Sequence, residues 1–174
     1  WKCPKSLATR CHPNVYRSRT MYLLAFVSFV SQQASSDHEK AQMKLLSAHA
    51  KLEMLWQLGA AEGSESTKLR KEFEGALRTA ELAVRLARPV GDAHLLGSAL
   101  HALGHAYWFG SRYTDALRAA DEAAPLLEES GDPEVEVRNL ALLAQAQNAV
   151  GDGAIAGQIL QRALDLARDA GDEA

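Results

Sequence analysis

The dipeptide Gly-Asp recurs at a constant interval of forty residues, at Gly91-Asp92, Gly131-Asp132 and Gly171-Asp172. Small and apolar residues recur at the same interval. These sets are Ala76/Ala116/Ala156, Ala83/Ala123/Ala163 and Leu86/Leu126/Leu166, and Phe73 corresponds to Tyr113. A sequence period between roughly twenty and fifty residues indicates a repeat array, in which each unit buries its apolar face only against its neighbours. The chain is therefore expected to fold as a stack of similar units.

The repeating units are expected to be helical. Aromatic residues make up only 6% of the chain, and the residues that dominate it, such as Ala, Leu, Glu and Arg, are good helix formers. Ser36 and Glu39 form a capping box that begins a helix ending near Gly59. Glycine, aspartate and proline signals then delimit five more helices, and Pro125 is expected to kink or interrupt one of them. The expected ranges are about 67–88, 92–109, 113–130, 132–151 and 154–170.

The middle unit resembles a known family. Leu100-x-x-Leu103-Gly104-x-x-Tyr107, followed by Tyr113-x-x-Ala116 and Ala120-x-x-Ala123, is similar to the tetratricopeptide repeat. The resemblance extends less fully over about residues 45–171. The period here is forty residues, whereas the usual repeat has 34. Similar long variants occur in large bacterial signalling ATPases and transcriptional regulators.

The resemblance implies an all-α fold, a right-handed α–α superhelix (a TPR-like solenoid) of about three helical hairpins. The repeat domain would span residues 37–174, with residues 1–36 as a basic and apolar non-repeat segment. Ala116, Ala120 and Ala123 lie on one helix face, where small side chains let neighbouring helices approach. Gly104 is expected to let the two helices of its own hairpin come close.

The resemblance also implies a binding surface, because the first helix of each tetratricopeptide hairpin lines the concave groove. His, Trp, Arg, Gln and Asn side chains there would hydrogen-bond an extended peptide or accept a helix, with tryptophan as an apolar anchor. The expected function is thus a protein–protein interaction scaffold. The alternative is a sensory or regulatory part of a larger bacterial signalling ATPase or transcriptional regulator. The corresponding residues are Glu53, Trp56, Ser98, His101, His105, Trp108, Arg138, Gln145 and Asn148.

Two motifs resemble a metal site and a phosphate-binding loop, but each lacks a residue or a structural element that such a site requires. His94, His101 and His105 lie near one helix face, yet the glutamate of the H-E-x-x-H zinc motif is missing between His101 and His105. The segment Gly151-Asp-Gly153-x-x-x-Gly157 resembles a phosphate loop but follows an expected helix rather than a strand, so a turn between helices is favoured. We therefore expect no catalytic residues, no cofactor and no metal site.

Charge is distributed unevenly. Residues 1–36 carry five Lys or Arg and no acid, a balance of +5, and since the whole chain is −3, the remainder is −8. An acidic repeat region argues against binding nucleic acid, which requires clustered cations.

Cys3 and Cys11 both lie in the basic segment, without the spacing of a zinc or haem motif. Free thiols are favoured over one local disulfide.

The apolar run at residues 21–30 has ten residues, too few to span a bilayer. It weakly resembles a signal-peptide core, but Gln32 makes a poor cleavage site, so a short helix packed on the first repeat is favoured and the expected location is cytoplasmic. Because the chain begins with Trp1, it is expected to be a fragment or a processed product.

The C-terminal helix is expected to lack a covering neighbour. Ile159, Leu160, Leu164 and Leu166 would then be partly exposed, and such an apolar surface favours self-association.

Overall fold

The structure is a computed structural model that describes residues 36–59 and 66–172, with side chains placed for 36–55 and 73–171. This part of the chain is helical and contains no strand, so the predicted all-α class is confirmed. A short 3-10 turn, Arg88–Val90, follows the second helix. The expectations for the cysteines and for the run at 21–30 concern residues that lie outside the described ranges. The helices are α2 (Asp37–Gly59), α3 (Ser66–Ala87), α4 (Ala93–Phe109), α5 (Tyr113–Ser130), α6 (Pro133–Val150) and α7 (Gly153–Asp172).

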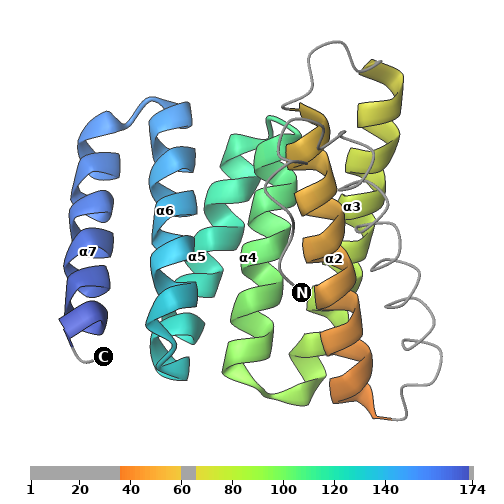
Figure 1. The fold of residues 1–174 in the computed structure, drawn as a ribbon, viewed down its shortest axis with the longest axis horizontal. Coiled ribbons are helices and arrows are strands. Elements are labelled where there is room, and N and C mark those ends of the chain that lie inside the picture. The colour runs from red at the N-terminus through yellow and green to blue at the C-terminus, as the bar shows by residue number, and fades with distance from the viewer. Residues whose placement is uncertain (1–35, 60–65, 173–174) are drawn as a thin grey trace, which may run out of the picture.

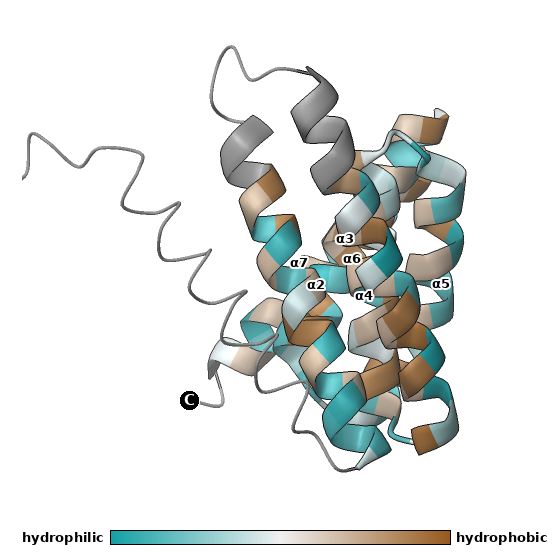
Figure 2. Cartoon of the chain, turned by 90° about the vertical axis from the view of Figure 1, so that its right-hand side faces the viewer, coloured by the Kyte–Doolittle hydropathy of each residue, from teal (hydrophilic) through white to brown (hydrophobic). Residues whose placement is uncertain are grey.

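The helices pack as successive pairs (Figure 1). Within pairs, α2 contacts α3, α4 contacts α5, and α6 contacts α7. Between pairs, α3 contacts α4 and α5 contacts α6, while the first helices are also neighbours, α2 with α4 and α4 with α6. The coloured parts of the helices carry both hydrophilic and hydrophobic residues (Figure 2). The three first helices α2, α4 and α6 therefore form one continuous layer.

The first two Gly-Asp pairs each lie between one helix and the next, whereas Gly171 and Asp172 are the last residues of α7. Gly91 and Gly131 have φ values of 75° and 69°, a left-handed conformation that glycine adopts without steric cost. The Asp92 and Asp132 carboxylates then accept hydrogen bonds from the backbone N–H of Leu95 (2.9 Å) and Val135 (3.3 Å), which satisfies first-turn N–H groups that have no helical partner. The sequence period thus reflects the capping of α4 and α6.

The segment Gly151–Gly157 contains the predicted turn between two helices at Gly151 and Asp152, and its remaining residues begin α7. It follows α6, Gly151 has a φ of 101°, and Asp152 accepts a hydrogen bond from the Ile155 N–H at 3.2 Å. Pro125 is exposed, and α5 is one helix from Tyr113 to Ser130 despite it.

Glycines in α4 allow contact with more than one neighbouring helix. A Cβ on Gly104 would lie 2.9 Å from Leu142 Cδ2 of α6 and 3.4 Å from the Ala116 carbonyl oxygen of α5. A Cβ on Gly97 would lie 2.7 Å from Leu127 Cδ2 of α5. Gly104 therefore serves the packing of the next hairpin at least as much as that of its own, which the repeat pattern did not indicate.

We expect Ala123→Trp to lower the free energy of unfolding by more than about 1–3 kcal/mol, the usual cost of overpacking. Ala123 is fully buried in the core shared by α2 to α5. Arg118→Ala is the control on the same helix, because the Arg118 side chain is 76% exposed, and it should change stability by no more than about 0.5 kcal/mol. Urea unfolding of the two variants measures both effects, and equal midpoints would contradict the assigned helix face.

Candidate functional site

The predicted binding residues lie on the three neighbouring first helices, but at different depths. Glu53 on α2 is exposed, as are Arg138, Gln145 and Asn148 on α6. On α4, His105 and Trp108 are partly buried, whereas Ser98 and His101 are buried. The side chain of Trp56 lies outside the described ones. Among these residues, the exposed surface comes mainly from α2 and α6, with α4 beneath and between them.

A buried polar chain joins α4, α6 and α5. The Asn139 amide nitrogen donates to the Ala120 carbonyl oxygen at 2.8 Å, and the Asn139 Oδ1 lies 3.3 Å from His101 Nδ1. Because Oδ1 can only accept, Nδ1 of His101 must carry the proton and donate it. The hydrogen bonds thus fix His101 as the Nδ1–H tautomer and fix the orientation of its ring.

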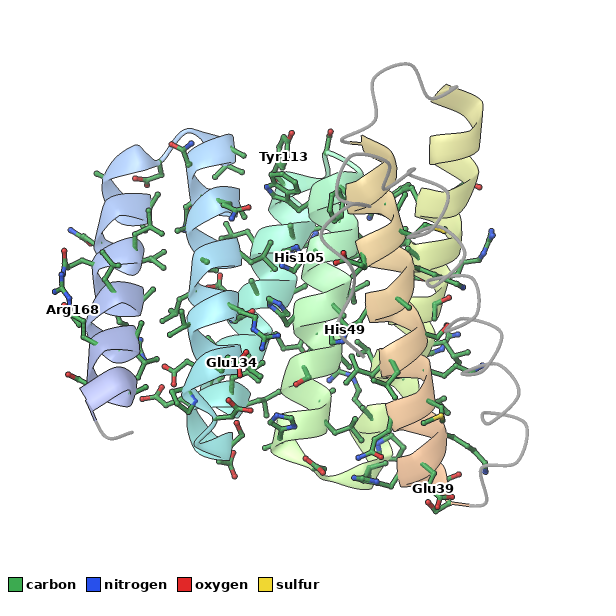
Figure 3. The ribbon with its side chains drawn as sticks, viewed as in Figure 1. Glu39, His49, His105, Tyr113, Glu134 and Arg168 are labelled. Carbon is green, nitrogen blue, oxygen red and sulfur yellow. The ribbon has the colours of Figure 1, made fainter. Side chains whose placement is uncertain are left out.

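Three histidines lie close to these buried hydrogen bonds. The His101 and His105 rings meet edge to face, with centroids 4.7 Å apart. His105 and His49 are labelled in Figure 3, where they project from the neighbouring helices α4 and α2. His49 also depresses the pKa values of both other histidines through its charge, which places it within electrostatic range of them. The cluster His49/His101/His105 therefore spans two helices of the first-helix layer.

The surroundings keep these histidines neutral. Burial lowers the pKa of His101 to about 3, with the nearby charge of His105 as the second cause. Burial likewise lowers the pKa of His105 to about 4, followed by the effect of His49. The pKa of His49 is also lowered, first by the surrounding protein atoms, although its side chain keeps access to solvent, and then by the positive charge of Arg138. At neutral pH the cluster offers imidazole groups that donate and accept hydrogen bonds.

Trp108 is partly used by the fold itself. It packs against the small core of Ala120, Leu142 and Leu143, and its ring meets Phe109 edge to face at a centroid distance of 5.5 Å. A partner would contact the part of the indole that this packing leaves open. Trp108 is therefore a firmly positioned apolar group rather than a mobile one.

The sequence pattern did not identify His49 or Asn139. His38 contacts the Asp92 cap at 3.1 Å, and His94 contacts the Asp132 cap at 3.3 Å. This repeated contact aligns the starts of α2 and α4 with an offset of 56 residues, which places His49 opposite His105. The resemblance instead aligns Leu58-Gly59 of α2 with Leu103-Gly104 of α4, an offset of 45 residues. The sequence signal for this register is the pairing of His38 with Asp92 and of His94 with Asp132, each histidine with the aspartate of the following Gly-Asp pair.

Other candidate features of the described residues add no further site. No group of three or more His, Cys, Asp or Glu side chains there is arranged to hold a metal ion. None of the described helices combines the length and hydropathy needed to cross a membrane. A pocket bordered by Tyr107, Arg118 and Glu122 lies between α3, α4 and α5 and includes none of the predicted binding residues. Neither the protein-family models nor the curated proteins contain a match to this chain.

Proposed function

We propose that this protein is an interaction module that binds a peptide or a helix across the layer formed by α2, α4 and α6. The observation that carries the proposal is the gathering of predicted site residues from α4 and α6 around a cluster that also includes His49 of α2. His105 and Trp108 are partly buried on α4, and Arg138 of α6 acts electrostatically on His49 of α2. A regulatory role within a larger signalling ATPase or transcriptional regulator would use the same surface.

The chemistry of this surface suits a polar segment with one apolar anchor. Neutral histidines, Gln145 and Asn148 offer hydrogen-bond donors and acceptors, and Trp108 offers an aromatic edge. Arg138 is already paired with Glu134 on its own helix, at an exposed position. A partner carboxylate would therefore compete with Glu134 for the guanidinium, a contact worth little at an exposed site unless other groups bind at the same time.

Selection of a random peptide library on the intact chain tests the proposal. The selected peptides should bind Gln145→Arg and Trp108→Ala about tenfold or more weakly than the parent chain, because these changes block the surface or remove its anchor. Fluorescence anisotropy with a labelled peptide measures the affinity, and circular dichroism confirms that helicity is retained.

The matched control for Gln145→Arg is Gln158→Arg. It introduces the same charge and bulk at an exposed position on α7, away from the α2/α4/α6 layer, and should leave peptide affinity unchanged. Equal loss in both variants, or peptides that bind every variant alike, would remove this layer from consideration.

A further inference from the structure

Helix α7 presents an apolar face to solvent. Its residues are separated by steps of four and three, which places them along one side of the helix. All six are exposed, and the two leucines are 46% and 52% exposed. We call this set the α7 face: Gly153, Gly157, Leu160, Leu164, Ala167 and Gly171.

The same positions are covered in the preceding hairpins. One period of forty residues earlier, Leu160 corresponds to Ala120, and two periods earlier to Ala80, both of which are fully buried. Leu164 corresponds to Ala124, which is partly buried, and two periods earlier to Val84, which is buried. Helices α3 and α5 pack against the next first helix, α4 and α6 respectively. The α7 face therefore continues an interface that the rest of the fold uses twice, and no described helix of this chain covers it.

Gly157 is the glycine of this face that lies in the interior of α7, whereas Gly153 and Gly171 lie at its ends. Glycine weakens a helix interior. In α4, a Cβ on Gly97 or Gly104 would come within 3 Å of a leucine on a neighbouring helix. A Cβ on Gly157 would meet nothing within 4 Å. Gly157 therefore leaves room for a further helix beside the two leucines.

The residue at position 160 is larger than its equivalents Ala120 and Ala80 in the two preceding hairpins. At the Ala120 position, a small side chain lets Asn139 of the next helix reach the Ala120 carbonyl oxygen at 2.8 Å. Leucine occupies the equivalent position 160, where its larger side chain would obstruct the same approach. A helix that covers the α7 face must therefore leave room for Leu160 and Leu164 and lie close to the small residues on either side of them.

A second copy of this chain meets the requirement. The face reads Gly, Gly, Leu, Leu, Ala, Gly, and its spacing is symmetric about residue 162. In an antiparallel pair, Leu160 lies opposite Leu164 of the second copy and Leu164 opposite its Leu160. Small residues then meet at both ends, Gly157 opposite Ala167 and Gly153 opposite Gly171. We propose that two chains pair through antiparallel α7 helices about a twofold axis, an isologous contact.

Charges at the edge of the face are compatible with this pairing. On the side away from α6, Gln161 would face Gln161 of the second copy, and Arg168 would face its Ala154. No like charges are brought into opposition there. The pairing uses α7 alone and leaves the α2/α4/α6 layer open, so it is independent of peptide binding.

Sedimentation velocity over a concentration series tests the proposal, with cysteines 3 and 11 replaced by serine to exclude disulfide dimers. The parent chain should associate reversibly to a dimer. Leu160→Glu and Leu164→Lys should each raise the dimer dissociation constant about 100-fold or more, because each introduces a charge into the contact at two places. Gln158→Glu adds a charge to α7 outside the face and should leave the dissociation constant unchanged.

Mixing the two variants tests the antiparallel geometry itself. In a mixed pair, the carboxylate introduced by Leu160→Glu lies opposite the ammonium introduced by Leu164→Lys, while the two remaining leucines meet each other. The mixture should therefore form a heterodimer that neither variant forms alone. A parent chain that stays monomeric, or a mixture that does not associate, would overturn the proposal.

Discussion

Acidification from pH 7 to pH 5 should lower the free energy of unfolding by about 2–4 kcal/mol, because neutral buried histidines bind protons only when the chain unfolds. In the folded chain the pKa of His101 is about 3 and that of His105 about 4, whereas an unfolded histidine has a pKa of about 6.5. Between these values the unfolded state holds more protons, so stability falls as pH falls. The lower end of the expected range corresponds to His101 alone, since His105 keeps partial access to solvent.

The groups around the two histidines strengthen this effect. His49 faces them from α2 and Arg138 from α6, and both oppose a positive charge at His101. The acidic residues at the helix starts act in a different window. Asp92 and Asp132 have lowered pKa values, so their contribution is lost only below about pH 4. Burial raises the pKa of Asp121, and a raised carboxyl pKa makes stability increase as the pH falls, so the predicted loss of stability between pH 7 and pH 5 comes from the histidines.

Urea unfolding at several pH values measures the effect, and His101→Phe separates its source. Removing one titrating histidine should reduce the slope of unfolding free energy against pH by up to about 1.4 kcal/mol per pH unit, the value for one proton. An unchanged slope in this variant, or a parent chain whose stability does not depend on pH in this range, would show that His101 is not held neutral by the fold.

Asn139→Ala should lower the free energy of unfolding by about 2–4 kcal/mol. The change removes two hydrogen bonds and leaves their partners, His101 Nδ1 and the Ala120 carbonyl oxygen, buried without the Asn139 amide. Asn139 is 1% exposed, and its amide connects His101 on α4 with the Ala120 carbonyl oxygen on α5. Asn148→Ala is the control, because the same residue type lies exposed on the same helix, and it should change stability by no more than about 0.5 kcal/mol.

A double-mutant cycle identifies the contact responsible. Because His101 and Asn139 share a hydrogen bond, Asn139→Ala and His101→Phe together should cost less than the sum of the single changes, with a coupling energy of at least about 0.5 kcal/mol. Additive effects would place the contribution of Asn139 in packing or in its bond to Ala120 instead.

Local signals in the sequence were sufficient to predict the helices. Ser36 with Glu39, Asp92, and Asp132 followed by Pro133 begin α2, α4 and α6 as expected. Such caps act over three or four residues and need no tertiary contact, so the sequence alone reveals them. The burial of Ala116, Ala120 and Ala123 also followed from the pattern, because the spacing of small residues marks a contact face whatever the partner helix is.

The depth of each candidate site residue was decided by tertiary structure. The resemblance placed Ser98 and His101 among the groove residues together with Arg138 and Gln145, yet the first two are buried and the last two exposed. Burial depends on how closely α2 and α6 approach α4, and that distance is set by contacts such as Gly104 with Leu142, which are far apart in sequence.

The histidine cluster likewise arose only in three dimensions. His49 and Asn139 come from different helices, and no local pattern links either of them to His101. Neutral imidazoles depend on burial between packed helices, and the tautomer of His101 depends on a carbonyl oxygen of a third helix. The sequence by itself determined where the helices begin and end, because capping acts between neighbouring residues. Only the packing of α2, α4, α5 and α6 decided which polar groups became one site.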